Sequence, residues 1–276
     1  MGNWLQRFVS VQRRWCEAFD RISVPARFHT EGNQYFQETY VRQHLRPGML
    51  VYDVGGGKRP FLSTAEKTAL DLSVYGLDID RDELASAPPG AYERVICSDI
   101  GAYAGNADAD VVICQAVLEH VRSSEKAIGA IASILKPGGM ALLFVPCRNA
   151  WYARLNLLLP QAWKRKLLFT IYPGTESTLG FPAYYDRCTP RDFAQIAAQN
   201  RLSVYNLQAH FKSYYFHFFF PLLVVWRTGL LLSHAIYGPQ VCESFCMVLR
   251  KPALIQHKND VDLAGCRADV SVEHSC

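Results

Sequence analysis

Val51-Tyr-Asp-Val-Gly-Gly-Gly-Lys-Arg-Pro60 is the stretch that decides the fold, because a short buried-type run leads directly into three glycines. Glycine has no Cβ, so such a turn can be sharp and its backbone N–H groups can lie against a ligand. An ordinary tight turn has the same local pattern. The surrounding sequence must therefore decide between a ligand site and a plain turn.

Further short runs of apolar and β-branched residues follow along the chain, bounded by Gly, Asp or Pro. With the first they are Met49–Val54, Val74–Ile79, Arg94–Ser98, Asp110–Gln115 and Met140–Val145. Runs of this kind, separated by helix-like stretches, indicate parallel strands buried on both faces. Alternation over 203–212 and an apolar run at 243–249 predict two more strands. The sequence thus predicts an α/β fold, a doubly wound, seven-stranded and mostly parallel sheet with helical insertions.

Composition excludes several classes of protein. The chain has 276 residues, of which 50% are hydrophobic and 20% charged, so it is not a disordered, collagen-like or disulfide-stapled small protein. Its nine cysteines are scattered singly without a C-x-x-C pair, which indicates neither a disulfide framework nor a zinc site. We expect reduced thiols and no metal. The first 14 residues lack the continuous apolar run of a signal peptide, so we expect a cytoplasmic protein.

Charge is distributed unevenly along the chain. Residues 50–125 carry 13 acids and 6 bases, a balance of −7 in a chain of net charge +4. By contrast, 147–175 and 201–242 contain no Asp or Glu. We expect an N-terminal helical segment at 1–48, a domain at 49–250 with insertions at 147–185 and 213–240, and a disordered tail at 251–276.

The most hydrophobic segment runs from Ser213 to Tyr237. Pro221 and Arg227 inside it disfavour a membrane-spanning helix, since a charge at the membrane centre costs about 2.5–3.5 kcal/mol. Two alternatives stay open: the segment lies in a membrane interface, at the inner face of a membrane, or it covers a hydrophobic substrate pocket. Before it, Pro160 is expected to open a short helix with Lys164 and Arg165 away from its apolar face. Two alternatives stay open for Lys164, Arg165 and Lys166: they contact phosphates of an anionic substrate or lipid head groups, or they form a solvated helix face.

Polar side chains stand where the predicted strands end. Asp78 ends the second strand, Asp99 follows the third and Gln115 ends the fourth. The carboxyl ends of parallel strands meet at one edge of a sheet, which is where open α/β folds bind ligands. An acid at the end of the second strand can accept two hydrogen bonds from a ribose diol. The sequence therefore predicts a nucleotide-type site at this edge.

Taken together, residues 49–146 resemble the class I S-adenosylmethionine-dependent methyltransferases, especially the small-molecule type. The similar motifs are Asp53-Val-Gly-Gly-Gly57, Gly76-Leu-Asp-Ile-Asp80, Cys97-Ser-Asp-Ile100, the segment from Asp110 to His120, and Leu135-Lys-Pro-Gly-Gly139. The resemblance implies S-adenosylmethionine as cofactor. It implies these cofactor-binding residues: Asp53 (amino group), Gly55, Gly56, Gly57, Asp78 (ribose), Ile79, Ser98, Asp99, Ile100 and Gln115. One departure is Arg59, which stands where the longer glycine pattern has a third glycine, so we expect the methionine end to be held differently.

The implied reaction is an in-line transfer of a methyl group to a nucleophile. For an oxygen acceptor, His120 is the candidate general base because the unperturbed pKa of histidine is near 6.5; its alternative role is capping or packing. Tyr184, Tyr185 and Arg187 are candidates for contacting the acceptor, and a polar surface loop is their alternative.

The insertions favour a small-molecule acceptor that is hydrophobic, lipid-linked or anionic, with peripheral membrane contact through 213–237. Nucleic acid is disfavoured, since Cys114-Gln-Ala-Val stands where base-methylating enzymes have their tetrapeptide. Two rival readings stay open. One is a nicotinamide-dependent oxidoreductase, although its G-x-G-x-x-G pattern would need glycine in place of Pro60. The other is a non-catalytic membrane-peripheral protein that binds S-adenosylmethionine. The sequence leaves the oligomeric state open.

Overall fold

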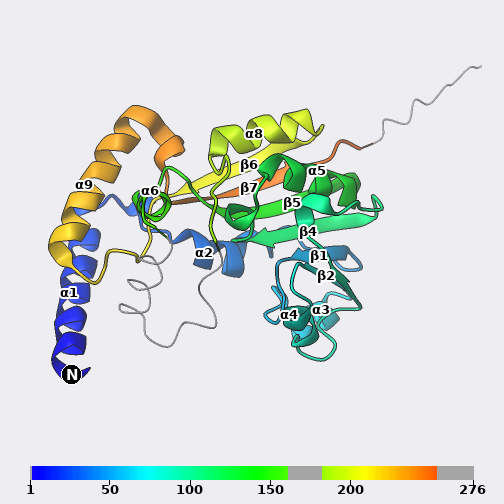
Figure 1. Ribbon diagram of the computed structural model, residues 1–276, viewed down its shortest axis with the longest axis horizontal. Helices are drawn as coiled ribbons and strands as arrows, with labels where there is room; N and C mark the ends of the chain where they lie inside the picture. The colour runs from blue at the N-terminus through cyan, green and yellow to red at the C-terminus, as the bar shows by residue number, and fades with distance from the viewer. Residues whose placement is uncertain (1, 161–181, 254–276) are drawn as a thin grey trace, which may run out of the picture.

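The computed structural model describes residues 2–160 and 182–253 (Figure 1). The strands are β1 (Leu50–Val54), β2 (Ser73–Asp78), β3 (Arg94–Cys97), β4 (Ala109–Gln115), β5 (Leu135–Pro146), β6 (Ser203–His210) and β7 (Ser244–Arg250). The α-helices are α1 (Gly2–Ser23), α2 (Gly32–Tyr35), α3 (Thr64–Ala69), α4 (Arg81–Ala85), α5 (Ser124–Ile134), α6 (Trp151–Leu158), α8 (Pro190–Gln199) and α9 (Phe220–Tyr237). Short helical turns are η1 (Ala26–Phe28), the π-helical η2 (Phe36–Tyr40), η3 (Ile100–Ala102), η4 (Leu118–His120) and η5 (Gly238–Val241).

Two predictions fall outside the described residues. The helix expected after Pro160, with Lys164, Arg165 and Lys166, belongs to the stretch that the structure does not describe. The same holds for the expected tail, apart from residues 251–253.

The strands form one sheet in the order β3-β2-β1-β4-β5-β7-β6. Strands β1 to β5 pair in parallel, and β7 runs antiparallel to both β5 and β6. The predicted fold class is confirmed. The antiparallel β7 also separates this sheet from the dinucleotide-binding arrangement, in which the strands follow the parallel order 3-2-1-4-5-6.

The register brings the strand ends together at one edge. Asp53 of β1 pairs with Gly76 of β2 and Ile113 of β4, and Asp78 pairs with Cys97 of β3. Parallel neighbours in register end side by side, so the glycine turn after β1 and the acid at the end of β2 lie at the same edge.

Helices cover both faces of the sheet because side chains alternate along each strand. In β1, Val51 packs into one core and Tyr52 into the other. One core is completed by buried residues of α5 and α8, such as Ile131 and Ile196. The other is completed by the N-terminal helices, where Phe36 is fully buried. The central strands are therefore buried on both faces, whereas the edge strands β3 and β6 keep side chains such as Val95 and Tyr205 exposed.

Helices α1 and α9 lie side by side at one end of the molecule, away from the centre of the sheet (Figure 1). Phe220, at the start of α9, makes edge-to-face ring contacts with Trp15 and Phe19 of α1. The Gln12 side chain accepts a hydrogen bond of 2.9 Å from the backbone N–H of Phe220. The first residues of the chain and the late insertion therefore form one unit, the α1–α9 pair.

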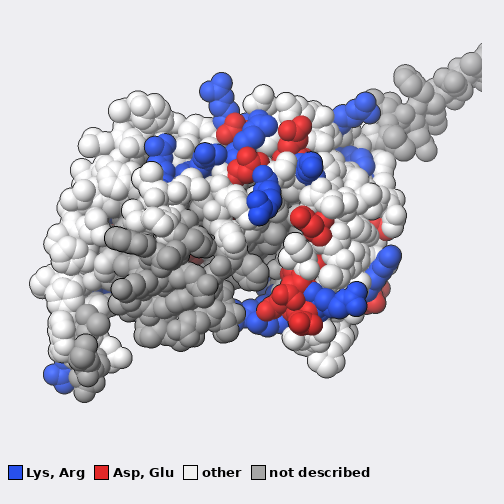
Figure 2. Space-filling model, viewed as in Figure 1, with Lys and Arg blue, Asp and Glu red and all other residues white. Residues whose placement is uncertain are grey.

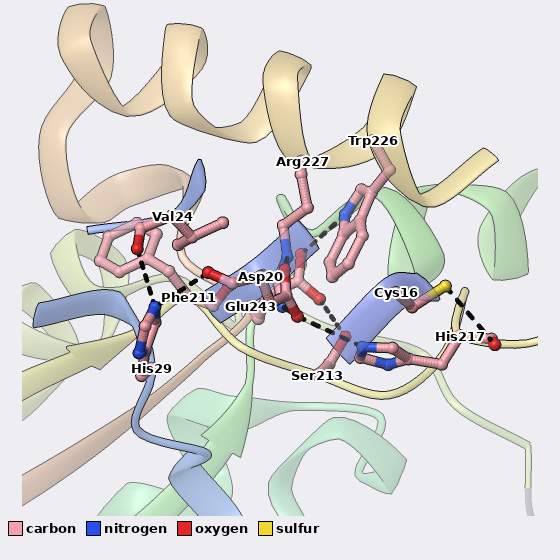
Figure 3. A network of polar contacts seen from close by, with 10 residues as sticks. All are labelled: Cys16, Asp20, Val24, His29, Phe211, Ser213, His217, Trp226, Arg227 and Glu243. Atoms are coloured by element: carbon pink, nitrogen blue, oxygen red, sulfur yellow. Dashed lines mark hydrogen bonds and ion pairs between the residues drawn. The ribbon is translucent and has the colours of Figure 1, made fainter. Parts of the chain in front are cut away.

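A buried ion pair fixes this unit (Figure 3). The Arg227 guanidinium, 1% exposed, makes two contacts with the Asp20 carboxylate, Nε to Oδ1 at 2.8 Å and Nη2 to Oδ2 at 3.0 Å. It also donates to the Phe211 carbonyl. The segment Phe220–Val241 is long and apolar enough to cross a membrane by length and composition, and 22% of its apolar 18-residue stretch is buried. Its one charge is directed inward and neutralised by the protein.

Candidate functional site

The glycine turn after β1 tolerates no side chain. Gly55 has a φ of +77°, and a Cβ there would lie 2.2 Å from Cγ2 of Val117. At Gly56 a Cβ would lie 2.4 Å from Oδ2 of Asp53. Such distances are far inside van der Waals contact, so the turn is packed tightly on its inner side and presents bare backbone on the other. This arrangement is typical of a backbone that has to approach a ligand closely.

Asp53 holds this turn in place. Its Oδ2 atom accepts hydrogen bonds from the backbone N–H of Phe61 at 2.7 Å and from the Tyr92 hydroxyl at 3.1 Å. The Tyr92 hydroxyl also lies 3.3 Å from the Gly57 carbonyl. Burial raises the pKa of Asp53 to about 6, against the two hydrogen bonds that favour its charged form. Asp53 therefore bridges the strand end, the turn and the residues that follow it; its contact with a cofactor amino group stays a prediction.

Tyr92 is a site residue that the sequence did not reveal. It precedes β3 and belongs to no recognised motif, and its hydroxyl meets Asp53 from 39 positions away. A signal was present in Gly76, inside β2, where a Cβ would lie 2.7 Å from the Tyr92 ring. Glycine inside a strand often marks such a close approach.

A cavity of about 330 Å³ opens at this edge of the sheet. Its lining residues are Gln37, Asp53, Val54, Gly55, Gly56, Gly57, Lys58, Arg59, Phe61, Asp78, Glu83, Gln115 and Ala116. The structure thus brings together the predicted residues of β1, its turn, the end of β2 and the end of β4. Ile79, Ser98, Asp99 and Ile100, also predicted to bind the cofactor, do not line this cavity.

Asp78 sits half-buried at the end of β2. Its Oδ1 atom accepts the backbone N–H of Asp80 at 2.9 Å. Its Oδ2 atom faces the turn, since a Cβ on Gly57 would lie 3.1 Å from it. Burial raises the pKa of Asp78, and the nearby Asp80 and Glu83 add to this effect. A carboxylate between a bare glycine turn and an open cavity is well placed to accept hydrogen bonds from a diol.

Lys58 and Arg59 follow the three glycines, and Arg59 stands where the longer glycine pattern has a further glycine. Lys58 forms an ion pair with Glu83, with Nζ 2.7 Å from Oε1. The backbone N–H of Arg59 donates to the Gly56 carbonyl at 2.8 Å, which closes the turn. Residues 58 and 59 therefore add two cationic side chains to a lining that otherwise carries three acids.

The N-terminal segment contributes to the site. The Gln115 amide donates to the Asn33 side-chain oxygen at 2.6 Å, which ties the end of β4 to α2. Gln37, from the π-helical η2, lines the cavity itself. Irregular helical turns of this type occur frequently at functional sites. The sequence predicted helices in 1–48 but no part for them in the site.

Residues near β3 have other partners. Asp99 caps η3, where its Oδ1 atom accepts the Gly101 N–H at 2.7 Å. Ile100 is 5% exposed and packs in the core, whereas Ile79 is largely exposed. The structure assigns the carboxylate of Asp99 and the side chain of Ile100 local structural contacts, and their contact with an adenine ring stays a prediction.

His120 and Glu119 follow β4 in η4. The Nδ1 atom of His120 lies 3.0 Å from the Pro182 carbonyl, which can only accept, so Nδ1 carries the proton and Nε2 of the neutral ring holds the lone pair. Burial lowers the pKa of His120, against the Pro182 bond that raises it. Glu119 is 4% exposed, and its Oε2 atom has no hydrogen-bond partner. Burial raises the pKa of Glu119 to about 8, so this carboxyl is protonated at neutral pH.

The predicted acceptor residues are brought near His120 by the backbone. The N–H groups of Tyr184 and Tyr185 both donate to the Glu119 carbonyl, at 2.8 and 3.0 Å. The Tyr185 side chain is buried in the core. Arg187 extends to α8, where its Nη2 atom lies 3.4 Å from the Gln195 side-chain oxygen. None of these three lines the cavity described above, and their contact with an acceptor stays a prediction.

A family model described as a methyltransferase domain matches residues 11–198. The chain belongs to the S-adenosylmethionine-dependent methyltransferase family. The ubiquinone biosynthesis O-methyltransferases of Burkholderia pseudomallei and Chromobacterium violaceum are 32% and 33% identical to it over 152 residues, or 52% and 53% of the chain. The match covers 63% of each relative, so the chain spans less than two thirds of their length.

The fold is shared more widely than the sequence. This chain is similar to the structure of Haemonchus contortus phosphoethanolamine N-methyltransferase 2 in complex with phosphomonomethylethanolamine and S-adenosylhomocysteine, with a TM-score of 0.50. The similarity covers 91% of this chain and 60% of the other at 15% identity, which supports the fold alone.

The residues present fit the cofactor of this family. The bare turn offers backbone N–H groups, and the Asp78 carboxylate offers acceptors for a ribose diol. The acidic side chains in the lining suit a positively charged sulfonium. Among residues 2–160 and 182–253, no group of three or more His, Cys, Asp or Glu side chains is placed to hold a metal ion.

Proposed function

We propose that this chain transfers a methyl group from S-adenosylmethionine to a small-molecule acceptor that is hydrophobic, lipid-linked or anionic. The observation that carries the proposal is the cavity at the strand ends, where a glycine turn without room for side chains faces the Asp78 carboxylate. Family membership supports methyl transfer as the chemistry.

In this proposal the protein acts mainly by positioning. The glycine turn and Asp78 hold and orient the nucleoside, and Asp53 with Tyr92 keeps the turn rigid. The cofactor, when bound, supplies a methyl group already activated by the positive charge on its sulfur. Aligning two reactants in a site can lower the activation free energy of the reaction by roughly 7–11 kcal/mol. This effect reduces the need for a strong base.

We assign the role of proton acceptor to His120 when the acceptor atom is oxygen. Its lowered pKa keeps the ring neutral near pH 7, and the bond from Nδ1 to the Pro182 carbonyl places the lone pair on Nε2, which lies 3.8 Å from Oε1 of the buried Glu119. The O-methyltransferase names of the matching relatives support an oxygen acceptor.

The proposed acceptor class is supported by the composition of the insertions. Residues 147–175 and 201–242 contain no acidic side chain, and large apolar side chains are exposed on α6, on α9 and at Tyr214 and Tyr215 between β6 and α9. An anionic or lipid-linked molecule meets no charge repulsion there. We propose a cytoplasmic protein that meets its acceptor at the inner face of a membrane, with contact through 213–237.

Calorimetric titration with S-adenosylmethionine tests the cofactor site. Asp78→Asn is expected to weaken binding at least tenfold, since hydrogen bonds to a charged acceptor contribute about 1.5–3 kcal/mol each. Asp82→Asn, the same charge change on the exposed side of α4, is the matched control and is expected to bind as the wild type does. Unchanged affinity in Asp78→Asn would refute the proposed site.

Two further measurements separate the rival functions. Titration with NAD is expected to give no binding, which would exclude an oxidoreductase. Transfer of labelled methyl groups into lipid and aqueous extract fractions then distinguishes an enzyme from a protein that only binds the cofactor. Labelling confined to polar, uncharged products would contradict the proposed acceptor class.

A further inference from the structure

Helix α1 presents an apolar stripe to solvent. Trp4, Phe8, Val11, Trp15 and Ile22 are spaced by four, three, four and seven residues, and each keeps between 40% and 79% of its accessible surface. At 3.6 residues per turn, these five positions fall within about 60° of one another around the helix. They lie beside the side that packs inward, where Gln12, Cys16 and Asp20 are buried, and at that border Trp15 also makes its ring contact with Phe220 of α9.

A row of arginines runs beside this stripe. Arg7, Arg14 and Arg21 are seven residues apart, all exposed, and therefore lie on one line along the helix. Within α1 the acidic residues are Glu17 and Asp20, and Asp20 is neutralised by Arg227. The helix thus has three longitudinal zones: a buried side, a Trp–Phe stripe and an arginine row.

We propose that this face of α1 docks on an anionic lipid bilayer, with the Trp–Phe stripe in the interface and the arginine row on the headgroups. An amphipathic helix of this composition, low in overall hydrophobicity and rich in Arg beside Trp and Phe, lies in a membrane interface. Tryptophan favours the headgroup level, and each basic residue near an anionic surface adds to the attraction. The inference deepens the proposed contact with a membrane surface and names a different element for it.

The rest of the α1–α9 pair is also consistent with docking on a lipid bilayer. Val225, Leu232 and Ile236 form a second exposed apolar stripe on α9, and α9 carries no acidic residue. Because Arg227 is held by Asp20, the only charge of α9 is kept away from its outer surface. On the face shown in Figure 2, acidic side chains gather over the region of α3 and α4, and the part formed by α1 and α9 carries few charges.

A second copy of the chain fits this face less well. The apolar spacing of four and three residues also occurs in coiled coils, where charged residues flanking the seam pair across the helices. In such a pairing Arg7, Arg14 and Arg21 would occupy equivalent flanking positions. The opposite flank, at Leu5, Gln12 and Phe19, holds no acid to receive them. Phosphate headgroups supply the missing negative charge.

Co-sedimentation of the full chain with vesicles tests the proposal. We expect binding to phosphatidylcholine vesicles that contain 30% phosphatidylserine (about a third anionic lipid, enough for a strong surface potential), weakened by salt, and little binding to pure phosphatidylcholine. The triple variant Arg7→Gln, Arg14→Gln, Arg21→Gln is expected to lose roughly tenfold or more in partitioning. The pair Trp4→Ser and Phe8→Ser, which removes apolar contact alone, is expected to lose a similar amount.

Matched control variants remove the same number of positive charges, or exposed apolar side chains, at positions outside α1. Arg81, Arg191 and Arg201 changed to Gln lower the charge equally, and Val95→Ser with Tyr205→Ser removes exposed apolar surface from β3 and β6. Both control sets are expected to bind vesicles as the wild type does. All variants change exposed side chains, and an unchanged melting temperature verifies their folding.

Vesicle binding tests the docking face of α1, and titration with S-adenosylmethionine tests the proposed function separately. Titration with S-adenosylmethionine is expected to be unchanged in every α1 variant, so loss of vesicle binding with intact cofactor binding supports the docking face. Absence of wild-type vesicle binding, or equal binding by the α1 variants and their controls, overturns it. Sedimentation equilibrium that shows a dimer lost in the α1 variants, without vesicle binding, would assign the face to a second copy instead.

Discussion

Glu119 is a buried carboxyl group whose surroundings differ strongly from water. It is fully buried beside β4, its Oε2 atom has no partner, and its pKa is raised to about 8 by burial. In an unfolded chain the same carboxyl titrates near pH 4.3. Between these two values the folded protein holds a proton that the unfolded chain has released.

This difference predicts a pH dependence of stability. The contribution of protonated Glu119 is fully present below about pH 4.3 and is lost as the pH rises through 8. From pH 5 to 8 the free energy of unfolding is therefore expected to fall more steeply in the wild type than in Glu119→Gln, by up to about 1.4 kcal/mol per pH unit. Urea denaturation at several pH values measures it. Glu125→Gln, at an exposed position, is the control, and equal slopes for the wild type and Glu119→Gln would contradict the assignment.

At the residue scale, local patterns predicted the glycine turn and Asp78, because both are properties of a strand and the residues that end it. The partners that complete the cavity were not predictable in this way. Tyr92 reaches Asp53 from 39 positions away, and Asn33 reaches Gln115 from 82 positions away. No periodicity or motif in a single sequence specifies which distant side chain will form such a hydrogen bond.

At the element scale, the chief surprise is α9. Arg227 interrupts a hydrophobic run, and on the sequence it is an unpaired charge that disfavours membrane spanning. In the fold it is paired with Asp20 of α1, while the neighbouring Glu243 accepts hydrogen bonds from Ser213 and Trp226 (Figure 3). The same residue that argued against a membrane span is what attaches the helix to the protein.

The pairing of Arg227 with Asp20 predicts that removing either partner lowers the free energy of unfolding strongly, and that the two losses are not additive. Arg227→Met leaves the Asp20 carboxylate buried without its counter-charge, and loss of about 3–5 kcal/mol is expected. Adding Asp20→Asn to Arg227→Met is expected to recover part of that loss, since position 20 then holds no uncompensated charge. Urea unfolding of the wild type, both single variants and the double variant measures the coupling. Arg191→Met, at an exposed position, is the control, and strictly additive losses would show that the two groups do not interact.

The strands were predictable to within a few residues because buried parallel strands leave near-continuous apolar runs. The start of β5 was not: the strand begins at Leu135 instead of Met140, with an irregularity in its pairing with β4. Lysine, proline and glycines at 136–139 read locally as a turn. Their pairing depends on the neighbouring strand, which local propensity does not contain.

At the scale of the whole molecule, cofactor binding is expected to stabilise the fold, because the site joins β1, β2, β4 and the N-terminal helices. A ligand that binds the folded state alone adds about 2.7 kcal/mol at one hundred times its dissociation constant. For a chain of this size the melting temperature is then expected to rise by roughly 5–10 °C. Scanning calorimetry with S-adenosylmethionine measures the shift, with NAD at equal concentration as control. Equal shifts with both nucleotides, or none with either, would contradict the proposed cofactor.

The sequence by itself determined the class of fold, the positions of most strands along the chain, the glycine turn and the acid at the end of β2, since each depends on residues close together in the chain. Only the tertiary structure decided that Tyr92 and the N-terminal helices complete the site, that Asp20 neutralises Arg227 from 207 positions away, and that α1 and α9 form one unit at the end of the sheet. Hydrogen bonds and ion pairs of this kind form when packing removes both partners from water, and packing is a property of the assembled chain.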